Sequence, residues 1–191
     1  MFFPVPAAIR RQAKSVHELA MVNLLIFNLL LLIALLGGSF VEPDSSLAPY
    51  RVAGVAVPLT ISLGIVAYSV LRARHAARVG PWFLAAHWRL ASRRYLMLLG
   101  LYLAGAGLIG LGWLLAHTQP LPGMAAMLFI ALQRVAIAPM LIGLMVLIML
   151  ASGAVYQAQR GEVPDHLVQR FPPPPDLSGA DTEFASGAAS A

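Results

Sequence analysis

Residues 72–94, RARHAARVGPWFLAAHWRLASRR, form the segment on which the topology of this chain depends. The segment separates two pairs of long apolar runs and contains six of the thirteen Lys and Arg residues of the chain. Because so many arginines are costly to carry across a bilayer, such a segment is expected to stay on the cytoplasmic side of a membrane. The orientation of the apolar runs on either side follows from this placement.

The apolar runs themselves are long. Of the 191 residues, 59% are hydrophobic and only 11% are charged, so lipid is the expected solvent for most of the chain. Each run is long enough to cross a hydrocarbon core of about 30 Å as a helix. The predicted spans are about 20–38, 52–71, 95–116 and 136–155. The pattern predicts an all-α integral membrane protein in which residues 1–156 form a four-helix transmembrane domain of two hairpins.

The charges support a membrane topology rather than nucleic-acid binding. The net charge is +5, but the positive residues border the apolar runs instead of gathering on a soluble domain. Eleven of the thirteen lie on one side of the predicted topology, and two, Arg51 and Arg134, lie on the other. The excess of positive charge on the cytoplasmic side predicts that both termini are cytoplasmic. The Arg-, Ala- and Leu-rich composition favours a bacterial inner membrane.

The basic segment itself contains a predicted helix start. Gly80-Pro81 is a break, after which Leu84, Trp88 and Ala91 share one helical face. This pattern predicts an amphipathic helix on the inner membrane surface that runs into the third span, with tryptophans and arginines in the layer of anionic head groups. An ordinary positive-inside loop is the alternative. The candidate lipid or partner contacts are Trp82, Trp88, Arg89, Arg93 and Arg94.

The third span carries the strongest packing signal. Gly100, Ala104 and Gly107 form a row of small residues on one face, and Ala106 with Gly110 supplies a second pair at the same spacing. Such rows let two helix backbones approach closely within a membrane. We expect this face to pack against another helix, either of this chain or of another subunit.

Polar side chains inside the spans require partners, because an unpaired amide or guanidinium in hydrocarbon is costly. Arg134 is expected at the outer boundary, where it can pair with Glu42 or Asp44. We expect the other polar side chains in the spans to hold helices together through hydrogen bonds, and the alternative is that they line a path for a solute. The candidate polar path consists of Asn23, Asn28, Gln133 and Arg134.

Two further features bear on function. His17 and His87 both fall near the inner surface, where surface histidines are the first interpretation and a pair of axial haem ligands is the alternative. Residues 157–191 change in composition and are expected to form a disordered cytoplasmic tail, with a proline stub at 172–175.

No sequence motif commits the chain to a reaction. The absence of cysteine excludes disulfides, thiolate zinc sites, iron–sulfur clusters and a cysteine nucleophile, and no H-E-x-x-H, G-x-S-x-G or phosphate-binding loop occurs. No cofactor is therefore expected. The first hypothesis is a non-enzymatic accessory or assembly subunit of a membrane complex, with a membrane-protein partner or a homo-oligomer. The alternatives are an oligomeric small-solute transporter or channel, and a haem-binding electron-transfer subunit.

Overall fold

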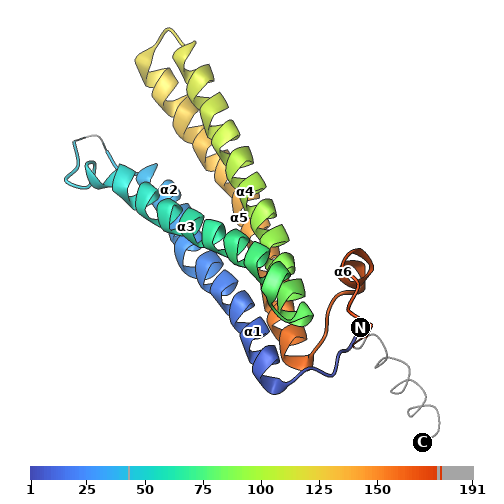
Figure 1. The fold of residues 1–191 in the computed structure, drawn as a ribbon. Helices are drawn as coiled ribbons and strands as arrows, with labels where there is room; N and C mark the ends of the chain where they lie inside the picture. Colours follow the sequence, from blue (N-terminus) through green and yellow to red (C-terminus); the bar gives the residue numbers. More distant parts are fainter. Residues whose placement is uncertain (43, 176, 178–191) are drawn as a thin grey trace, which may run out of the picture. The chain divides into compact units, whose positions relative to one another are not determined.

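The structure is a computed structural model that describes residues 1–42, 44–175 and 177 (Figure 1). Its regular elements are helices, and within the described residues the only β-bridge joins Phe2 and Glu162. In chain order the elements are α1 (Ala7–Val22), η1 (Asn23–Asn28), α2 (Leu29–Gly38), α3 (Tyr50–Val79), α4 (Trp82–His117), α5 (Pro122–Arg160) and α6 (Asp165–Arg170). The element η1 is a π-helix that joins α1 and α2 without a break.

Four of the helical segments are long and apolar enough to cross a membrane. They are Ala7–Gly38, Tyr50–Val79, Trp82–His117 and Gly123–Arg160, and they contain 30 to 38 residues each. At about 1.5 Å per residue even the shortest is about 45 Å long, which exceeds a hydrocarbon core of about 30 Å. The predicted all-helical fold with four helices of membrane-spanning length is confirmed, and each helix continues beyond its predicted span.

The chain divides into two compact units. Unit 1 comprises Met1–Met21, Val66–Arg94 and Met149–Ala191, and unit 2 comprises Val22–Ile65 and Tyr95–Ile148. Arg51 and Arg134 are the Lys and Arg residues of unit 2, and the other eleven belong to unit 1. The division therefore separates a strongly basic part of the sequence from an almost uncharged one.

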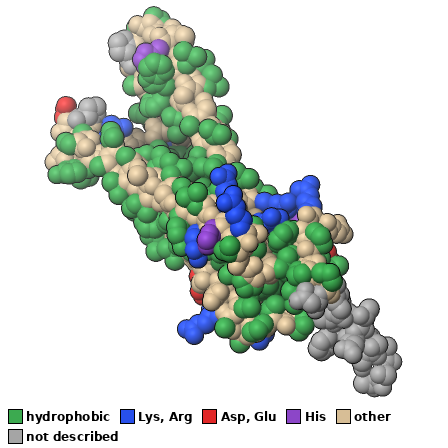
Figure 2. All heavy atoms as spheres, viewed as in Figure 1, with side chains coloured by type: hydrophobic (Ala, Val, Ile, Leu, Met, Phe, Trp, Pro, Cys, Tyr) green, Lys and Arg blue, Asp and Glu red, His purple; other side chains and the backbone are tan. Residues whose placement is uncertain are grey.

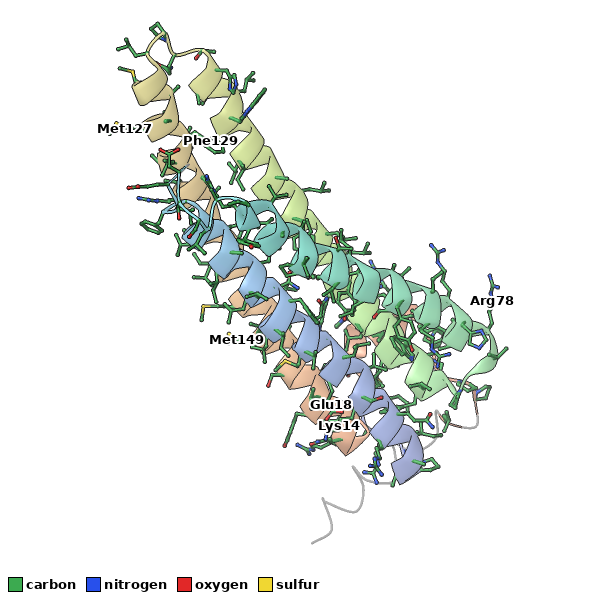
Figure 3. All side chains as sticks on the ribbon, turned by 90° about the vertical axis from the view of Figure 1, so that its left-hand side faces the viewer. Lys14, Glu18, Arg78, Met127, Phe129 and Met149 are labelled. Carbon is green, nitrogen blue, oxygen red and sulfur yellow. The ribbon has the colours of Figure 1, made fainter. Side chains whose placement is uncertain are left out.

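The core of unit 1 is built around small side chains that let helices approach closely. Ala13, Ala86, Ala154 and Ala158, from α1, α4 and α5, are all completely buried. Phe83 lies fully buried in the same cluster. On the polar face of α1, Lys14 and Glu18 form an ion pair of 2.9 Å and lie side by side (Figure 3).

The segment after α5 is ordered as far as it is described, although we expected a disordered tail from residue 157. Gly161 ends α5 with a positive φ of 80°, and the Glu162 N–H donates to the Gln157 carbonyl at 2.9 Å, which closes a Schellman cap. A Cβ on Gly161 would lie 2.8 Å from the Phe3 carbonyl oxygen, so glycine is required there. The expected tail at 178–191 lies outside the described residues.

The following helix α6 belongs to the core of unit 1. Its residues Leu167 and Val168 are buried, as is Val163 before it. The Trp82 indole N–H donates to the Phe171 carbonyl at 3.1 Å. These apolar contacts account for the order of a segment whose polar composition suggested disorder.

The core of unit 2 contains a regular seam between α4 and α5. Leu98, Gly105 and Gly112 recur every seven residues on α4, and all three are buried. The Met140 side chain fills the space beside Gly105, and Leu132 lies against Gly112. Seven-residue spacing is typical of helices that pack at a small crossing angle.

Apolar side chains are spread over the visible faces of α3, α4 and α5 in Figure 2. Val52, Leu103 and Met127 are each at least 75% exposed. Large apolar side chains exposed in such numbers are unfavourable in water and favourable in lipid. The surface thus agrees with the membrane-spanning lengths of the helices.

Candidate functional site

A closed ring of three polar side chains lies inside unit 2. The Asn28 amide donates to the Ser62 hydroxyl at 3.0 Å, and the Tyr102 hydroxyl donates to the Asn28 carbonyl oxygen. Because the Tyr102 proton goes to Asn28, the Ser62 hydroxyl is the donor in its 2.7 Å contact with Tyr102. Each member of the ring thus donates once and accepts once. The ring links η1, α3 and α4 and satisfies groups that would otherwise be costly in an apolar interior.

The π-helix explains how Asn28 reaches this position. In η1 the backbone pattern advances by five residues per hydrogen bond, so Asn23 and Asn28 come to lie on one buried face. The Asn28 amide donates to the Asn23 backbone carbonyl at 2.9 Å. Two asparagines five residues apart were the only signal of this local structure in the sequence.

A cavity of about 10 Å³ adjoins the ring. Its walls are mostly leucine side chains, and Asn28 and Tyr102 supply the polar lining. A volume of this size is at the lower limit for a single water molecule. The cavity is far too small to hold a solute.

A second polar group in unit 2 lies at the end of α2. The Gln133 amide donates to the Leu35 carbonyl at 3.0 Å. The Arg134 guanidinium donates to the Ser39 hydroxyl at 3.2 Å and to its carbonyl at 3.4 Å, and it stacks on Phe40. These bonds satisfy carbonyls that the end of a helix leaves without partners.

One prediction about these polar residues is therefore wrong. Arg134 was expected to pair with Glu42 or Asp44, but in the described part of the chain it bonds to Ser39 instead. The path for a solute through an oligomer stays a prediction, and two residues of the candidate polar path lie at different hollows of the single chain. Asn28 lines the 10 Å³ cavity and Gln133 lines a separate groove, and the two share no lining residue.

In unit 1, His17 and His87 hydrogen-bond to each other, with 2.9 Å between Nε2 of His17 and Nδ1 of His87. Both side chains are buried, so the interpretation as surface histidines is wrong. A metal ion between two imidazole nitrogens needs about 2 Å to each of them. The two nitrogens are 2.9 Å apart, so there is no room between them for the iron of a haem. The ring of Phe83 also packs against the ring of His87, with 4.6 Å between their centroids.

The tryptophans of the basic segment also lie in the core of unit 1. Trp82 and Trp88 are 9% and 7% exposed, where we expected side chains in the head-group layer. Trp82 packs between Phe3 and Phe171, and Trp88 packs against Tyr68. The apolar face that suggested a surface helix is thus turned toward other helices of the same unit.

The arginines of the same segment differ from one another. The Arg89 guanidinium lies over the Phe171 ring at 3.7 Å, which fixes the end of the described C-terminal segment. Arg93 and Arg94 remain partly exposed. Of the five residues predicted to contact lipid or a partner, Arg93 and Arg94 are the two that are partly exposed and are not stacked on an aromatic ring.

The small-residue row of α4 does not touch another helix within the described residues. No neighbouring atom lies within 4 Å of the position of a Cβ on Gly100, Gly107 or Gly110, and Ala104 is exposed. The described glycines whose Cβ position lies within 3.0 Å of a side chain on another helix are Gly105, Gly112 and Gly143. Their seven-residue spacing relative to Leu98 was the signal that could have identified the first two.

The helix lengths, the apolar surface and the buried polar groups together define a multi-pass α-helical membrane protein. Comparison with protein-family models, with curated proteins and with solved structures finds no match for this chain.

Proposed function

We propose that this protein is a non-enzymatic accessory or assembly subunit of a larger complex in a bacterial cytoplasmic membrane. It acts through helix packing and binds either a different membrane protein or further copies of itself. The observation that carries the proposal is the outward small-residue face of α4, formed by Gly100, Ala104, Gly107 and Gly110.

The two small faces of α4 are used differently. On one face, the space beside Gly105 and Gly112 is filled by Met140 and Leu132 of the same chain. On the other face, Gly107 has no described neighbour within 4 Å of its Cβ position. A small-residue row permits the close backbone contact that drives helix association in lipid, where the hydrophobic effect contributes little. A helix of another subunit is the partner that fits this second face.

The buried polar groups support a packing role. Asn28, Ser62 and Tyr102 satisfy one another, and Gln133 and Arg134 bond to the end of α2. A transport function would use such groups to bind a solute, but here they join helices of the same unit. The 10 Å³ cavity beside Asn28 also favours packing over transport.

The proposed orientation places both termini in the cytoplasm. Unit 1 contains eleven of the thirteen Lys and Arg residues, and it includes residues from both ends of the chain. Cytoplasmic loops carry such an excess, and their cations attract anionic head groups by about 1 kcal/mol each near the surface. Arg93 and Arg94 are the proposed contacts of α4 with those head groups.

The test is purification of the tagged chain from its native membranes in mild detergent, followed by mass spectrometry of everything that co-purifies. We expect a stoichiometric partner, or a defined homo-oligomer, that Gly107→Leu removes. Gly64→Leu is the matched control, because Gly64 is an exposed helical glycine without a neighbour within 4 Å. A monomer in the unsubstituted protein, or equal losses from the two variants, would contradict the proposal.

A further inference from the structure

Unit 2 contains a groove of about 450 Å³ that the proposed packing role does not use. Four helices line it: α2 contributes Leu35, α3 contributes Leu59, α4 contributes Ile109 and α5 contributes Phe129. The volume falls within the range of about 300–1,000 Å³ that is usual for small-ligand sites. Phe129 lies on a different side of α5 from the highly exposed Met127 (Figure 3). The groove is an open hollow between four helices, and Phe129 forms part of its wall.

The groove has a cation at one end. Arg51 stands in the first turn of α3, and its Nε lies 4.0 Å from the place where a Cβ would stand on Gly38. Among the described residues the ion pairs are Met1–Asp165, Lys14–Glu18 and Arg160–Glu162, so none of them involves Arg51.

Arg51 differs in this from the other polar groups nearby. The Gln133 amide bonds to the Leu35 carbonyl, and the Arg134 guanidinium bonds to Ser39. The Arg51 guanidinium makes no corresponding bond to a described residue. It is thus the cation that the groove presents to a ligand.

The depth of the groove matches one membrane leaflet. Arg51 and Leu59 are eight residues apart on one helix, which corresponds to about 12 Å along its axis. Half of a hydrocarbon core of about 30 Å is about 15 Å. A ligand with a charged group at Arg51 would thus place its apolar part at the depth of a lipid acyl chain in the same leaflet.

We propose that this groove binds one acyl chain of an anionic phospholipid, whose phosphate pairs with Arg51. The apolar walls match the chain, and a guanidinium forms two parallel hydrogen bonds to a phosphate group. A zwitterionic lipid carries a compensating positive charge and is bound less well. The site is separate from the small-residue face of α4, so a failure of either proposal leaves the other standing.

The test uses the full-length protein in mild detergent and a phosphatidylglycerol that carries a photoreactive diazirine near the end of one acyl chain. A phosphatidylcholine with the same chain serves as the comparison lipid. We expect labelling by phosphatidylglycerol to exceed labelling by phosphatidylcholine and to map to the helices that line the groove. Arg51→Gln should lower phosphatidylglycerol labelling about tenfold, because it removes the charge-assisted hydrogen bonds to the phosphate. Arg74→Gln, an exposed arginine on the same helix, should leave it unchanged.

A second pair of variants tests the apolar part. Val55 lines the groove, so Val55→Trp fills it and should lower labelling by both lipids. Val57 is an exposed residue of α3 outside the groove, so Val57→Trp should leave labelling unchanged. If Val55→Trp does not fold, the comparison of Arg51→Gln with Arg74→Gln decides. Equal labelling by the two lipids, no effect of Arg51→Gln, or a protein segment cross-linked in the groove in native membranes would overturn the proposal.

Discussion

The imidazoles of His17 and His87 share a hydrogen bond of 2.9 Å in the core of unit 1, between Nε2 of one and Nδ1 of the other. In such a pair one ring donates and the other accepts, so the accepting ring is neutral. The pair joins α1 to α4 across 70 residues of sequence. Its contribution to stability therefore depends on both members being present.

Removal of one histidine should be more harmful than removal of both. His87→Leu leaves the buried His17 without its partner and should lower the free energy of unfolding by about 1–3 kcal/mol. The double variant His17→Leu/His87→Leu should recover part of this loss, because neither polar group remains unpaired. Thermal unfolding in detergent measures all three proteins, with the exposed His75→Ala as the control. A double variant that is less stable than the His87→Leu protein would contradict the coupling.

The polar ring of unit 2 gives a second prediction. Tyr102→Phe removes the hydroxyl that contacts both Ser62 and Asn28, and should destabilise the protein by about 0.5–2 kcal/mol, the range found for polar contacts between membrane helices. Tyr50→Phe is the control, since Tyr50 is 68% exposed. Denaturant titration of both variants in detergent provides the comparison. Equal stabilities would show that the ring does not hold the helices together.

Two neighbouring glycines on α4 should respond differently to the same substitution. Gly105→Leu drives a side chain into Met140 and should cost about 1–3 kcal/mol through overpacking. Gly107→Leu meets no described atom and should change the stability of the isolated chain by less than about 0.5 kcal/mol. Thermal unfolding of the purified single chain tests this difference. Similar losses from both substitutions would mean that the two faces have been assigned incorrectly.

The order of the segment after α5 depends on its aromatic contacts. Phe171→Ala removes the ring that Arg89 covers and that stacks on Trp82, so the segment from Gly161 to Phe171 should open more often. Limited trypsin digestion should then cleave after Arg160 several times faster. His166→Ala, on the exposed side of α6, should not change the cleavage rate. Unchanged digestion of the Phe171 variant would show that the segment is held by other contacts.

The orientation is tested by reporter fusions. A fusion at Ser46 or Thr118 should report the outside of the membrane, and a fusion at Ala77 should report the cytoplasm, because the positive residues predict this topology. Paired reporters that are active on opposite sides provide an internal control. An external signal at Ala77 would reverse the proposed orientation.

Some of this structure could be predicted from the sequence, and some could not. The length of an apolar run is enough to predict a spanning helix, so the four long helices follow directly. The packing faces do not, because α4 carries small residues on several sides. Whether Gly105 or Gly107 meets a neighbour depends on the position of Met140 on α5. The sequence of α4 alone does not reveal that position.

The buried histidines and the C-terminal segment show the same limit. His17 and His87 lie in sequence contexts typical of a membrane surface, and only the packing of α1 against α4 brings them together. The segment around α6 is short and polar, and it becomes ordered because Leu167 and Phe171 find apolar partners elsewhere in unit 1. Such long-range contacts leave no periodic pattern in the local sequence.

The most direct test of the proposed function is native mass spectrometry of the protein released from its own membranes in mild detergent. The proposal predicts a particle that contains this chain with a stoichiometric partner or with further copies of itself, and predicts that Gly107→Leu reduces it to the single chain. A single chain in the unsubstituted protein would contradict a role in helix packing between subunits.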